Sequence, residues 1–313
     1  MSQRRSGKAI NGWAVVDKTI GISSTQAVSM VRRAFDARKA GHAGTLDPLA
    51  SGLLPIALGE ATKLIPFLQD RKKEYSFTIN WGEERNTDDS VGEIMKTSSI
   101  RPSFEQIEKV LPDFVGQTDQ TPPVFSAIKI NGRRAYSLAR AGAEIIMKPR
   151  QVQIFSLKLL QVVDKDKAKF SVCCGKGTYV RSLGRDIARR LDTFGYISAL
   201  RRTVNGPFSE KNAIPLDNYD SVVHIAFPPS FLLPLEAVLD DIPAVFLNPE
   251  QVDHIRHGRA VSLVDLEEVD NPETLRVRLG NNTVCAMADG QLIALARLEG
   301  GRLYPKRVLN RNN

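Results

Sequence analysis

Apolar and polar residues alternate in several segments of the chain, with the two-residue period typical of β-strands. Segment 73–81 is an example, because Tyr75, Phe77 and Ile79 fall on one face of an extended chain. Further apolar runs, bounded by turn-forming residues, predict strands at 12–18, 53–58, 152–163 and 169–174. The last two segments are close enough in sequence to form a pair.

Other segments have the period of an α-helix. Ser23 and Gln26 have the spacing of a capping box, which predicts a helix start. Ser103 and Gln106 repeat this spacing. The apolar residues of that second helix are Phe104, Ile107, Val110 and Leu111. The core face of a third predicted helix consists of Val180, Leu183, Ile187 and Leu191.

Strands and helices are mixed without strict alternation. This order predicts an α+β fold with a mixed, largely antiparallel sheet flanked by helices. The composition changes after Pro228, where several prolines bracket a connecting segment. Short apolar runs then follow at the close spacing of a small β-barrel, at 261–263, 275–279, 284–288, 292–298 and 303–308. We therefore expect two domains, 1–239 and 240–313.

Segment 124–150 interrupts the pattern of the first domain because it has few strongly apolar runs. It contains a turn at Asn131 and Gly132, followed by a short basic helical piece. These features predict a mobile insertion.

The chain is basic. Its 313 residues include 43 Lys plus Arg against 35 Asp plus Glu, a net charge of +8. This excess favours a polyanionic partner such as nucleic acid. The basic residues form short clusters, for example Arg133 with Arg134 and Arg201 with Arg202. Any single cluster is more often a solvated surface face. Only the clusters taken together favour a polyanionic partner.

Several kinds of site and location are disfavoured by the residues that the chain lacks. Cys173 and Cys174 are neighbours among three cysteines, which does not suggest a disulfide framework. No Cys-x-x-Cys is present, and His254 and His257 have no cysteine beside them, so we expect no metal. No apolar run approaches the roughly 20 residues of a membrane span, and residues 1–8 lack a signal peptide's apolar core. We expect a cytoplasmic protein without membrane contact.

The most unusual segment is 41–52, Gly-His-Ala-Gly-Thr-Leu-Asp-Pro-Leu-Ala-Ser-Gly. Gly41 and Gly44 permit a backbone that side chains would block, and Pro48 disfavours a helical conformation at Asp47. The segment is therefore suited to hold the Asp47 carboxylate on a rigid loop. Alternatively, Asp47 caps a helix whose first residue is Pro48, which is a common arrangement. Spacing alone does not separate these two interpretations.

The motif resembles the catalytic segment of the TruB family, the tRNA pseudouridine-55 synthases, whose single aspartate corresponds to Asp47. The segments Lys73-Glu-Tyr75, Lys176-Gly-Thr-Tyr179-Val-Arg181 and Leu200-Arg-Arg-Thr also resemble family motifs. Segment 123–136 is similar to the family's RNA-gripping insertion, and the C-terminal strands are similar to a PUA-type RNA-binding domain. The chain departs from the family pattern at Arg85-Asn-Thr-Asp-Asp89, which leaves the role of Asp89 open.

The resemblance implies that the chain converts uridine 55 in the T-arm of tRNA to pseudouridine, as a monomer, without a cofactor or a guide RNA. Aspartate has a reference pKa of about 3.9, so an aspartate nucleophile needs no activating base at neutral pH. The resemblance makes Asp47 this nucleophile and Arg181 its ionic partner. Tyr75 would stack on a base extruded from its helix, Leu200 would pack against that base, and His42 would fill the vacated space. The other residues expected to bind substrate or RNA are Tyr179, Lys18, Lys63, Lys129, Arg133 and Arg134.

The spacing of Tyr179 and Arg181 adds a structural expectation. Residues two apart share a side of an extended chain but not of a helix, so both line a site only if the helix begins near Arg181.

More ordinary interpretations remain open without the resemblance. Tyr75 would be a core residue of a strand, and Arg181 would share a solvated helix face with Arg185 and Arg189. An RNA-binding protein without catalysis would explain the charge and the barrel equally well. A cofactor-dependent methyltransferase is disfavoured because a glycine-rich strand-to-helix turn is missing, and the insertion disfavours a guide-RNA-dependent relative.

Overall fold

The structure, a computed structural model, describes residues 7–130, 132–143, 145–216, 229–262 and 282–310. The strands of its largest sheet are β1 (Gly12–Lys18), β2 (Ala40–His42), β3 (Ser51–Leu58), β4 (Lys73–Trp81), β7 (Gly116–Gln120), β10 (Arg150–Asp164), β11 (Lys167–Cys174), β12 (Gly195–Asn205), β13 (Phe208–Ser209) and β14 (Ile214–Pro215). Their order is β14–β1–β3–β12–β4–β11–β10–β7, with β2 beside β3 and β13 beside β12. The described pairs are antiparallel except β1–β14 and β3–β12, so the expected mixed, largely antiparallel sheet is confirmed.

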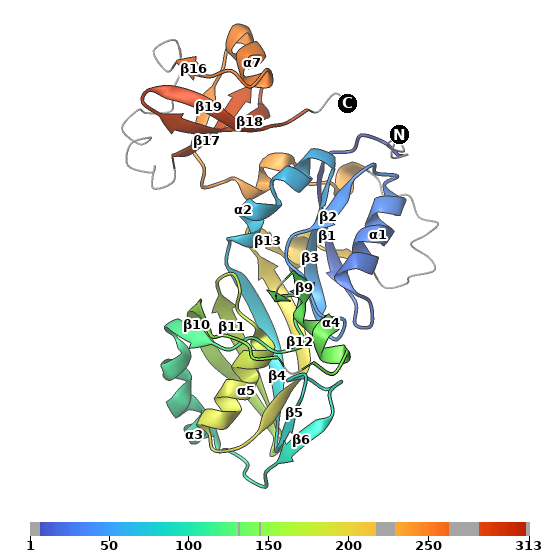
Figure 1. The fold of residues 1–313 in the computed structure, drawn as a ribbon, viewed down its shortest axis with the longest axis vertical. Helices are drawn as coiled ribbons and strands as arrows, with labels where there is room; N and C mark the ends of the chain where they lie inside the picture. Colours follow the sequence, from blue (N-terminus) through green and yellow to red (C-terminus); the bar gives the residue numbers. More distant parts are fainter. Residues whose placement is uncertain (1–6, 131, 144, 217–228, 263–281, 311–313) are drawn as a thin grey trace.

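Helices flank this sheet, as expected, and Figure 1 shows α1 beside β1 and β3 and α5 beside β4 and β12. The α-helices are α1 (Ser24–Ala34), α2 (Ile65–Gln69), α3 (Phe104–Val110), α4 (Ala135–Arg140), α5 (Val180–Arg190) and α7 (Pro249–Arg256). Short 3-10 turns are formed by Gly59–Lys63, Leu111–Phe114, Glu210–Asn212, Pro229–Phe231 and Leu235–Val238. No helix within the described ranges is long and apolar enough to cross a membrane.

Both predicted capping boxes are confirmed. Ser23 and Ser103 each accept a hydrogen bond from the backbone N–H three residues later, and the glutamine at that position accepts one from the cap backbone. Satisfying two N–H groups at a helix start in this way fixes where the helix begins. Phe104 is an exception on its helix, because it is exposed while Ile107 and Val110 are buried.

The alternating face of β4 packs into the main core. Phe77 and Ile79 are buried, and Phe77 stacks on Phe170 of β11 with ring centroids 5.3 Å apart. Leu183 and Ile187 of α5 belong to the same apolar cluster. Full burial of each such side chain stabilises the fold by roughly 1.5–3 kcal/mol, so α5 is held firmly against the sheet.

Four residues lie in one row across four neighbouring strands. They are Lys18 of β1, Gly52 of β3, Arg202 of β12 and Tyr75 of β4. Directly paired residues point to the same face of a sheet, so Lys18, Arg202 and Tyr75 share a face. Because β3 begins at Ser51, the glycine-rich segment 41–50 ends beside this row.

The C-terminal residues form a second sheet in the order β15 (Ala244–Phe246), β17 (Thr283–Ala288), β18 (Gln291–Glu299), β19 (Arg302–Val308) and β16 (Val261–Ser262). Four of its strands, β16 to β19, match predicted runs, whereas the strand expected at 275–279 lies outside the described residues. The closure of this sheet into a barrel therefore stays a prediction. Hydrogen bonds connect the C-terminal region to the first domain, among them those from Lys63 Nζ to the Val308 carbonyl (2.8 Å) and from Asn310 N to Glu60 Oε2 (2.7 Å).

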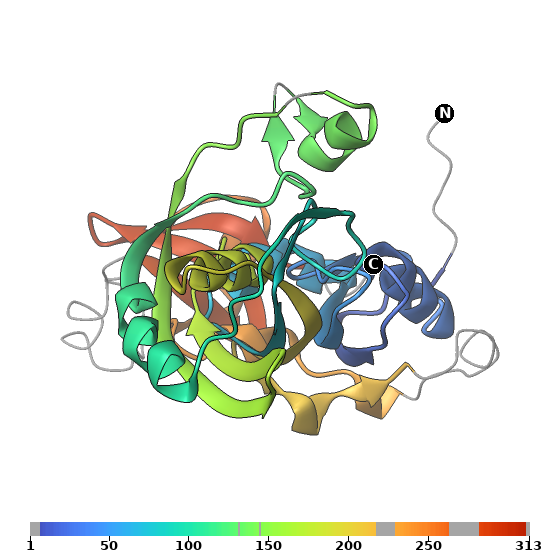
Figure 2. The same ribbon diagram turned by 90° about the horizontal axis from the view of Figure 1, so that it is seen from below.

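The expected insertion contains a small hairpin, β8 (Lys129–Ile130) and β9 (Arg133–Arg134), followed by α4. The predicted short basic helical piece is therefore confirmed. Asn131 of the predicted turn lies outside the described residues. Figure 2 shows that the hairpin and α4 project from the body of the protein. A second hairpin, β5 (Glu83–Arg85) with β6 (Ile94–Thr97), lies at an edge of the body.

A substitution at Gly52 tests how closely β3 and β12 approach each other. Its φ is +99°, and a Cβ there would lie 2.3 Å from the Arg202 carbonyl oxygen. We expect Gly52→Ala to lower the free energy of unfolding by at least about 3 kcal/mol, because backbone strain and overpacking add. Gly290→Ala is the matched control, since Gly290 has φ +69° but open space around it, and it should cost only about 1–2 kcal/mol. Urea unfolding measures both, and equal costs would contradict the close approach.

Candidate active site

Polar side chains hold the backbone of the glycine-rich segment through hydrogen bonds. Ser24 Oγ, at the start of α1, accepts a hydrogen bond from Leu46 N (2.8 Å) and donates one to the Leu46 carbonyl (2.9 Å). The Asn205 side chain donates to the Ala43 carbonyl at 3.0 Å. Because these contacts fix the backbone on both sides of Gly44, the residue that follows Leu46 has a defined position.

Gly44 supplies the turn that the sequence suggested. Its φ is +96°, in the region that glycine adopts without strain, and a Cβ there would lie 3.3 Å from Arg202 Nη1. Gly41 has no such φ, but a Cβ there would lie 3.2 Å from the side chain of Ile65. Both glycines therefore let a neighbouring side chain approach the loop backbone, and Gly44 also adopts a conformation that favours glycine.

Asp47 does not cap a helix. The Ala50 N–H donates to the Asp47 carbonyl at 3.0 Å, which closes a turn over Pro48 and Leu49, and strand β3 begins at the next residue. The helix-cap interpretation of Asp47 is therefore wrong, and its side chain is free to bind elsewhere.

That side chain forms an ion pair with Arg181, 134 positions later in the sequence. Arg181 Nε donates to Asp47 Oδ2 at 2.8 Å, and Nη2 donates to Oδ1 at 3.3 Å. A two-point contact between a guanidinium and a carboxylate fixes the direction of both groups. The Arg181 side chain is 5% exposed and that of Asp47 is 33% exposed, so the arginine covers one side of the carboxylate and the other side stays open.

Arg181 has further acceptors, which explains how a buried charge is tolerated. Its Nη1 donates to the Thr87 carbonyl at 2.9 Å and lies 3.6 Å from Asp89 Oδ2, and its Nη2 donates to the Phe125 carbonyl at 3.0 Å. The solvated-face interpretation is therefore wrong for Arg181. It is also wrong for Arg185, which is buried and paired with a carboxylate.

Arg185 Nη1 donates to Asp88 Oδ2 at 2.8 Å. Burial raises the pKa of Asp88 to about 6, although the charges of Arg185 and Arg181 oppose that rise. This second pair holds the middle of α5 against the loop that carries Asp88.

The helix begins where the spacing of Tyr179 and Arg181 requires. Tyr179 is the N-cap of α5 with an extended backbone, φ −102° and ψ 111°. Gln120 of β7 closes this end, because its side chain accepts from Tyr179 N (2.8 Å) and donates to the Tyr179 carbonyl (3.1 Å). The predicted helix start near Arg181 is confirmed.

A cavity of about 650 Å³ opens in front of the Asp47–Arg181 pair. Tyr75, Tyr179 and Leu200 line it together with the two charged residues. Tyr75 also packs against the main core. It is therefore both a core residue of its strand and a residue of the cavity wall. Burial raises the pKa of the Tyr75 phenol, and the charge of Arg202 opposes that rise.

His42 is not among the residues that line this cavity. It lies in β2, and its buried Nδ1 has no hydrogen-bond partner among the described residues. Burial, followed by the charge of Arg202, lowers the pKa of its imidazole.

The sequence is similar to those of proteins with known activities. The family model for the N-terminal domain of TruB family pseudouridylate synthases matches residues 32–180. A tRNA pseudouridine synthase B of Caulobacter vibrioides is 49% identical over 310 residues, which cover 98% of this chain and 99% of the relative. One of Bradyrhizobium diazoefficiens is 48% identical over 312 residues, 98% and 88% of the two chains. The chain belongs to the TruB family.

As a TruB family member the chain is a pseudouridine synthase. Solved structures support the fold. A Cbf5–Nop10–Gar1 complex matches with a TM-score of 0.71 at 24% identity, covering 96% of this chain and 86% of that chain. An archaeal box H/ACA sRNP Nop10–Cbf5 complex matches with a TM-score of 0.69 at 22% identity, covering 96% and 87%. At these identities the likeness extends to the fold alone.

Arg202 is the residue of this TruB family site that sequence reasoning missed. It is 1% exposed, and it donates to the Leu53 carbonyl (2.7 Å) and to the Gly44 carbonyl (3.1 Å). The only sequence signal is its place in Leu200-Arg-Arg-Thr, where alternation sends one arginine inward. Its neighbour Arg201 faces outward and binds Asp17 at 2.6 Å.

The basic residues expected to contact RNA are in different settings. Lys129, Arg133 and Arg134 are exposed on the hairpin of the insertion. Lys63 is half-buried and donates to the Val308 carbonyl. No cluster of three or more metal-binding side chains is gathered among the residues with described positions.

Lys18 is fully buried, so its ammonium group is not presented at the surface. It donates to the carbonyls of Thr19 (2.8 Å) and Ile22 (2.9 Å). Burial lowers the pKa of Lys18 to about 8, the charge of Asp47 opposes this change, and that of Arg202 adds to it.

The lowered pKa of Lys18 predicts how stability depends on pH. Between about pH 8 and 10.5 the unfolded chain binds this proton more tightly than the folded one, so the contribution of Lys18 to the free energy of unfolding should rise with pH. Lys18→Met should remove this contribution but not the similar one of buried Lys73, whose pKa is also about 8. Urea unfolding at a series of pH values measures the slope. The exposed Lys129→Met serves as control, and an unchanged slope in Lys18→Met would refute the assignment.

Proposed function

We propose that this enzyme converts uridine 55 in the T-arm of tRNA to pseudouridine, with Asp47 as the nucleophile. The observation that carries the proposal is the Asp47–Arg181 ion pair, which has one open side facing a cavity large enough for a nucleotide. The names of the relatives, tRNA pseudouridine synthase B over nearly the whole chain, support tRNA as the substrate.

The reaction breaks the bond between the ribose and the base nitrogen, turns the base while it stays bound, and re-forms the link through carbon. A nucleophile serves the first of these changes. The two-point contact with Arg181 fixes the direction of the Asp47 carboxylate, which stays partly exposed for attack. No histidine is needed to activate a carboxylate, and His42 lies outside the cavity lining.

Access to the cavity requires the target base to leave its stack, at a cost of a few kcal/mol. Stacking on an aromatic ring returns roughly 1–3 kcal/mol per base. Tyr75 and Leu200 supply an aromatic and an aliphatic wall of the same cavity, which supports base extrusion. Tyr179 adds a third wall, and His42 remains our candidate for the space that the base vacates.

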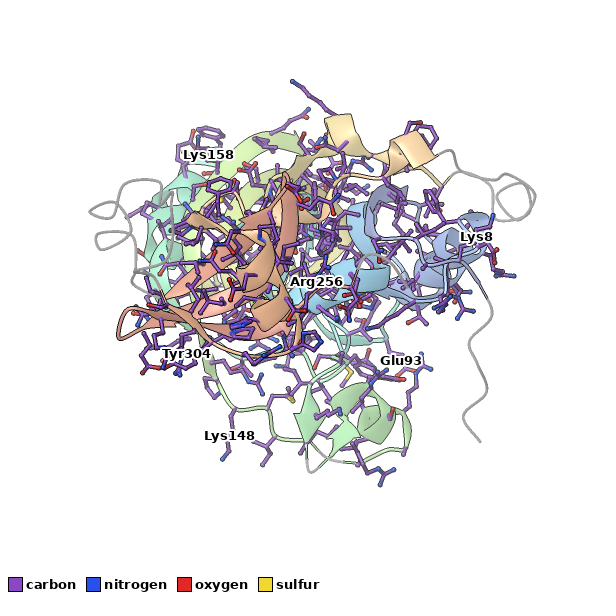
Figure 3. The ribbon with its side chains drawn as sticks, turned by 90° about the horizontal axis from the view of Figure 1, so that it is seen from above. Lys8, Glu93, Lys148, Lys158, Arg256 and Tyr304 are labelled. Carbon is purple, nitrogen blue, oxygen red and sulfur yellow. The ribbon has the colours of Figure 1, made fainter. Side chains whose placement is uncertain are left out.

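Two parts of the chain are proposed to grip the RNA. One is the insertion at 124–150, whose Lys129, Arg133 and Arg134 are exposed. Figure 3 shows Lys148, near the end of the insertion, directed away from the body of the protein. The other is the C-terminal domain, 240–313, as a PUA-like module. Neutralising phosphates with such residues favours binding of a polyanion. We expect the enzyme to act as a monomer in the cytoplasm, without a guide RNA or a cofactor.

A protein that only bound RNA would have no use for a buried, two-point ion pair beside a nucleotide-sized cavity. Burying Arg181 carries a desolvation cost. This arrangement favours catalysis over simple binding.

Asp47→Asn tests the nucleophile directly. We expect pseudouridine formation at position 55 to fall by at least about 10³-fold, because an amide cannot replace the carboxylate. Folding should survive, since Arg181 keeps Asp89 and two carbonyl acceptors. The measurement is chemical mapping of pseudouridine in unmodified tRNA, with tRNA affinity measured in parallel and expected to be retained.

Asp113→Asn is the matched control, because Asp113 also pairs with an arginine, Arg190, at 2.8 Å but on the surface. It should keep wild-type activity. Turnover by Asp47→Asn would remove the role of Asp47, and modification of a different uridine by the wild type would refute the proposed position.

A further inference from the structure

Ser126 has a buried hydroxyl that the fold leaves unsatisfied. The residue is 4% exposed, it lines the cavity in front of Asp47, and its Oγ has no hydrogen-bond partner among the described residues. Buried polar atoms without a partner are rare in folded proteins, and each one calls for an explanation. A hydroxyl that lines a nucleotide-sized cavity is explained most simply by a ligand.

The backbone of Ser126 is fully used, which fixes the position of its side chain. Its N–H donates to the Val124 carbonyl (2.9 Å), and its carbonyl accepts from Tyr136 N (3.1 Å) at the start of α4. The preceding carbonyl, that of Phe125, accepts from Arg181. One short stretch of chain therefore touches both the ion pair and the cavity.

The residues before this stretch are anchored to α5. The Thr121 carbonyl accepts from Ser182 Oγ (2.9 Å) and from Arg185 Nη2 (2.8 Å), and Gln120 closes the start of the helix. The root of the insertion is thus tied to the helix that carries Arg181. This anchoring holds Ser126 in a defined place relative to Asp47.

Ser126 and Tyr179 both line the cavity. Burial raises the pKa of the Tyr179 phenol, and a side-chain interaction of hydrogen-bond type with Ser126 opposes part of that rise. The two hydroxyls are nevertheless not in full hydrogen-bonding geometry, and Ser126 Oγ has no other partner among the described residues. Its capacity to donate and to accept is therefore available to a bound molecule.

We propose that Ser126 binds the target nucleotide through a hydrogen bond between its hydroxyl and a polar group of that nucleotide. The inference rests on the proposed function and adds to it. The root of the insertion then forms part of the active-site wall, in addition to the role of the insertion in gripping RNA. A uridine nucleotide offers three kinds of partner: the carbonyls and N–H of the base, the 2′-hydroxyl of the ribose, and the phosphate oxygens.

Ser126→Ala removes the hydroxyl and nothing else. We expect kcat/KM for pseudouridine formation in tRNA to fall about 3- to 10-fold, the effect of one neutral hydrogen bond. Because the hydroxyl has no partner within the protein, the thermal unfolding temperature should stay the same or rise. The control is Ser171→Ala, a half-buried serine of β11 that does not line the cavity, and it should remain within about two-fold of the wild type.

The outcomes separate the inference from the proposed function. An active wild type with an equally active Ser126→Ala overturns the inference and leaves the function standing. A loss of activity together with a lower unfolding temperature assigns Ser126 a structural role and also overturns it. A wild type that forms no pseudouridine in tRNA removes the proposed function, and the inference falls with it.

A second arm identifies the group that Ser126 contacts. The affinities of wild type and Ser126→Ala are compared for a T-arm stem-loop with uridine or 2′-deoxyuridine at the target position. If the partner is the ribose hydroxyl, the variant's loss of affinity disappears with the deoxy substrate. If the partner is the base or a phosphate, the loss is the same for both stem-loops. No loss with either stem-loop counts against the proposal.

Discussion

The Asp47–Arg181 ion pair is the contact on which the arrangement of this site depends. It joins a glycine-rich loop to the start of α5 across 134 positions of sequence. The loop is fixed by Ser24, and Arg181 is fixed by backbone carbonyls and Asp89. Each partner is thus held independently of the other, so the geometry of the ion pair is preorganised. The open edge of the carboxylate is a consequence of this arrangement.

The sheet explains why the pair and the cavity coincide. Residues in one row across β1, β3, β12 and β4 bring Lys18, Arg202 and Tyr75 to one face. Gly52, in the same row, has no side chain, so the backbone of Arg202 approaches it closely. The Arg202 side chain reaches the loop carbonyl of Gly44. A polar row inside a sheet is costly unless its members find partners. Here Arg202 donates to the carbonyls of Leu53 and Gly44, and Lys18 donates to those of Thr19 and Ile22.

Much of the framework could be predicted from the sequence. Both capping boxes and the alternation of 73–81 follow local rules and were correct. The strand β12 was missed because its buried positions include Gly195, Arg202 and Asn205, which do not look like a core face. For the same reason the burial of Lys18 could not be anticipated, since lysine is rarely buried. Pairing of Asp47 with Arg181 came from the family resemblance, because no periodicity relates residues so far apart.

The central claim is that the Asp47 carboxylate meets a nucleotide swung out of its helix. A crystal structure of the Asp47→Asn variant with an unmodified T-arm stem-loop tests it most directly. The account predicts the target uridine outside the stack, between Tyr75 and Leu200, with its glycosidic bond next to the side chain at position 47. A uridine still stacked in the loop, with the cavity at position 47 empty of RNA, would contradict it.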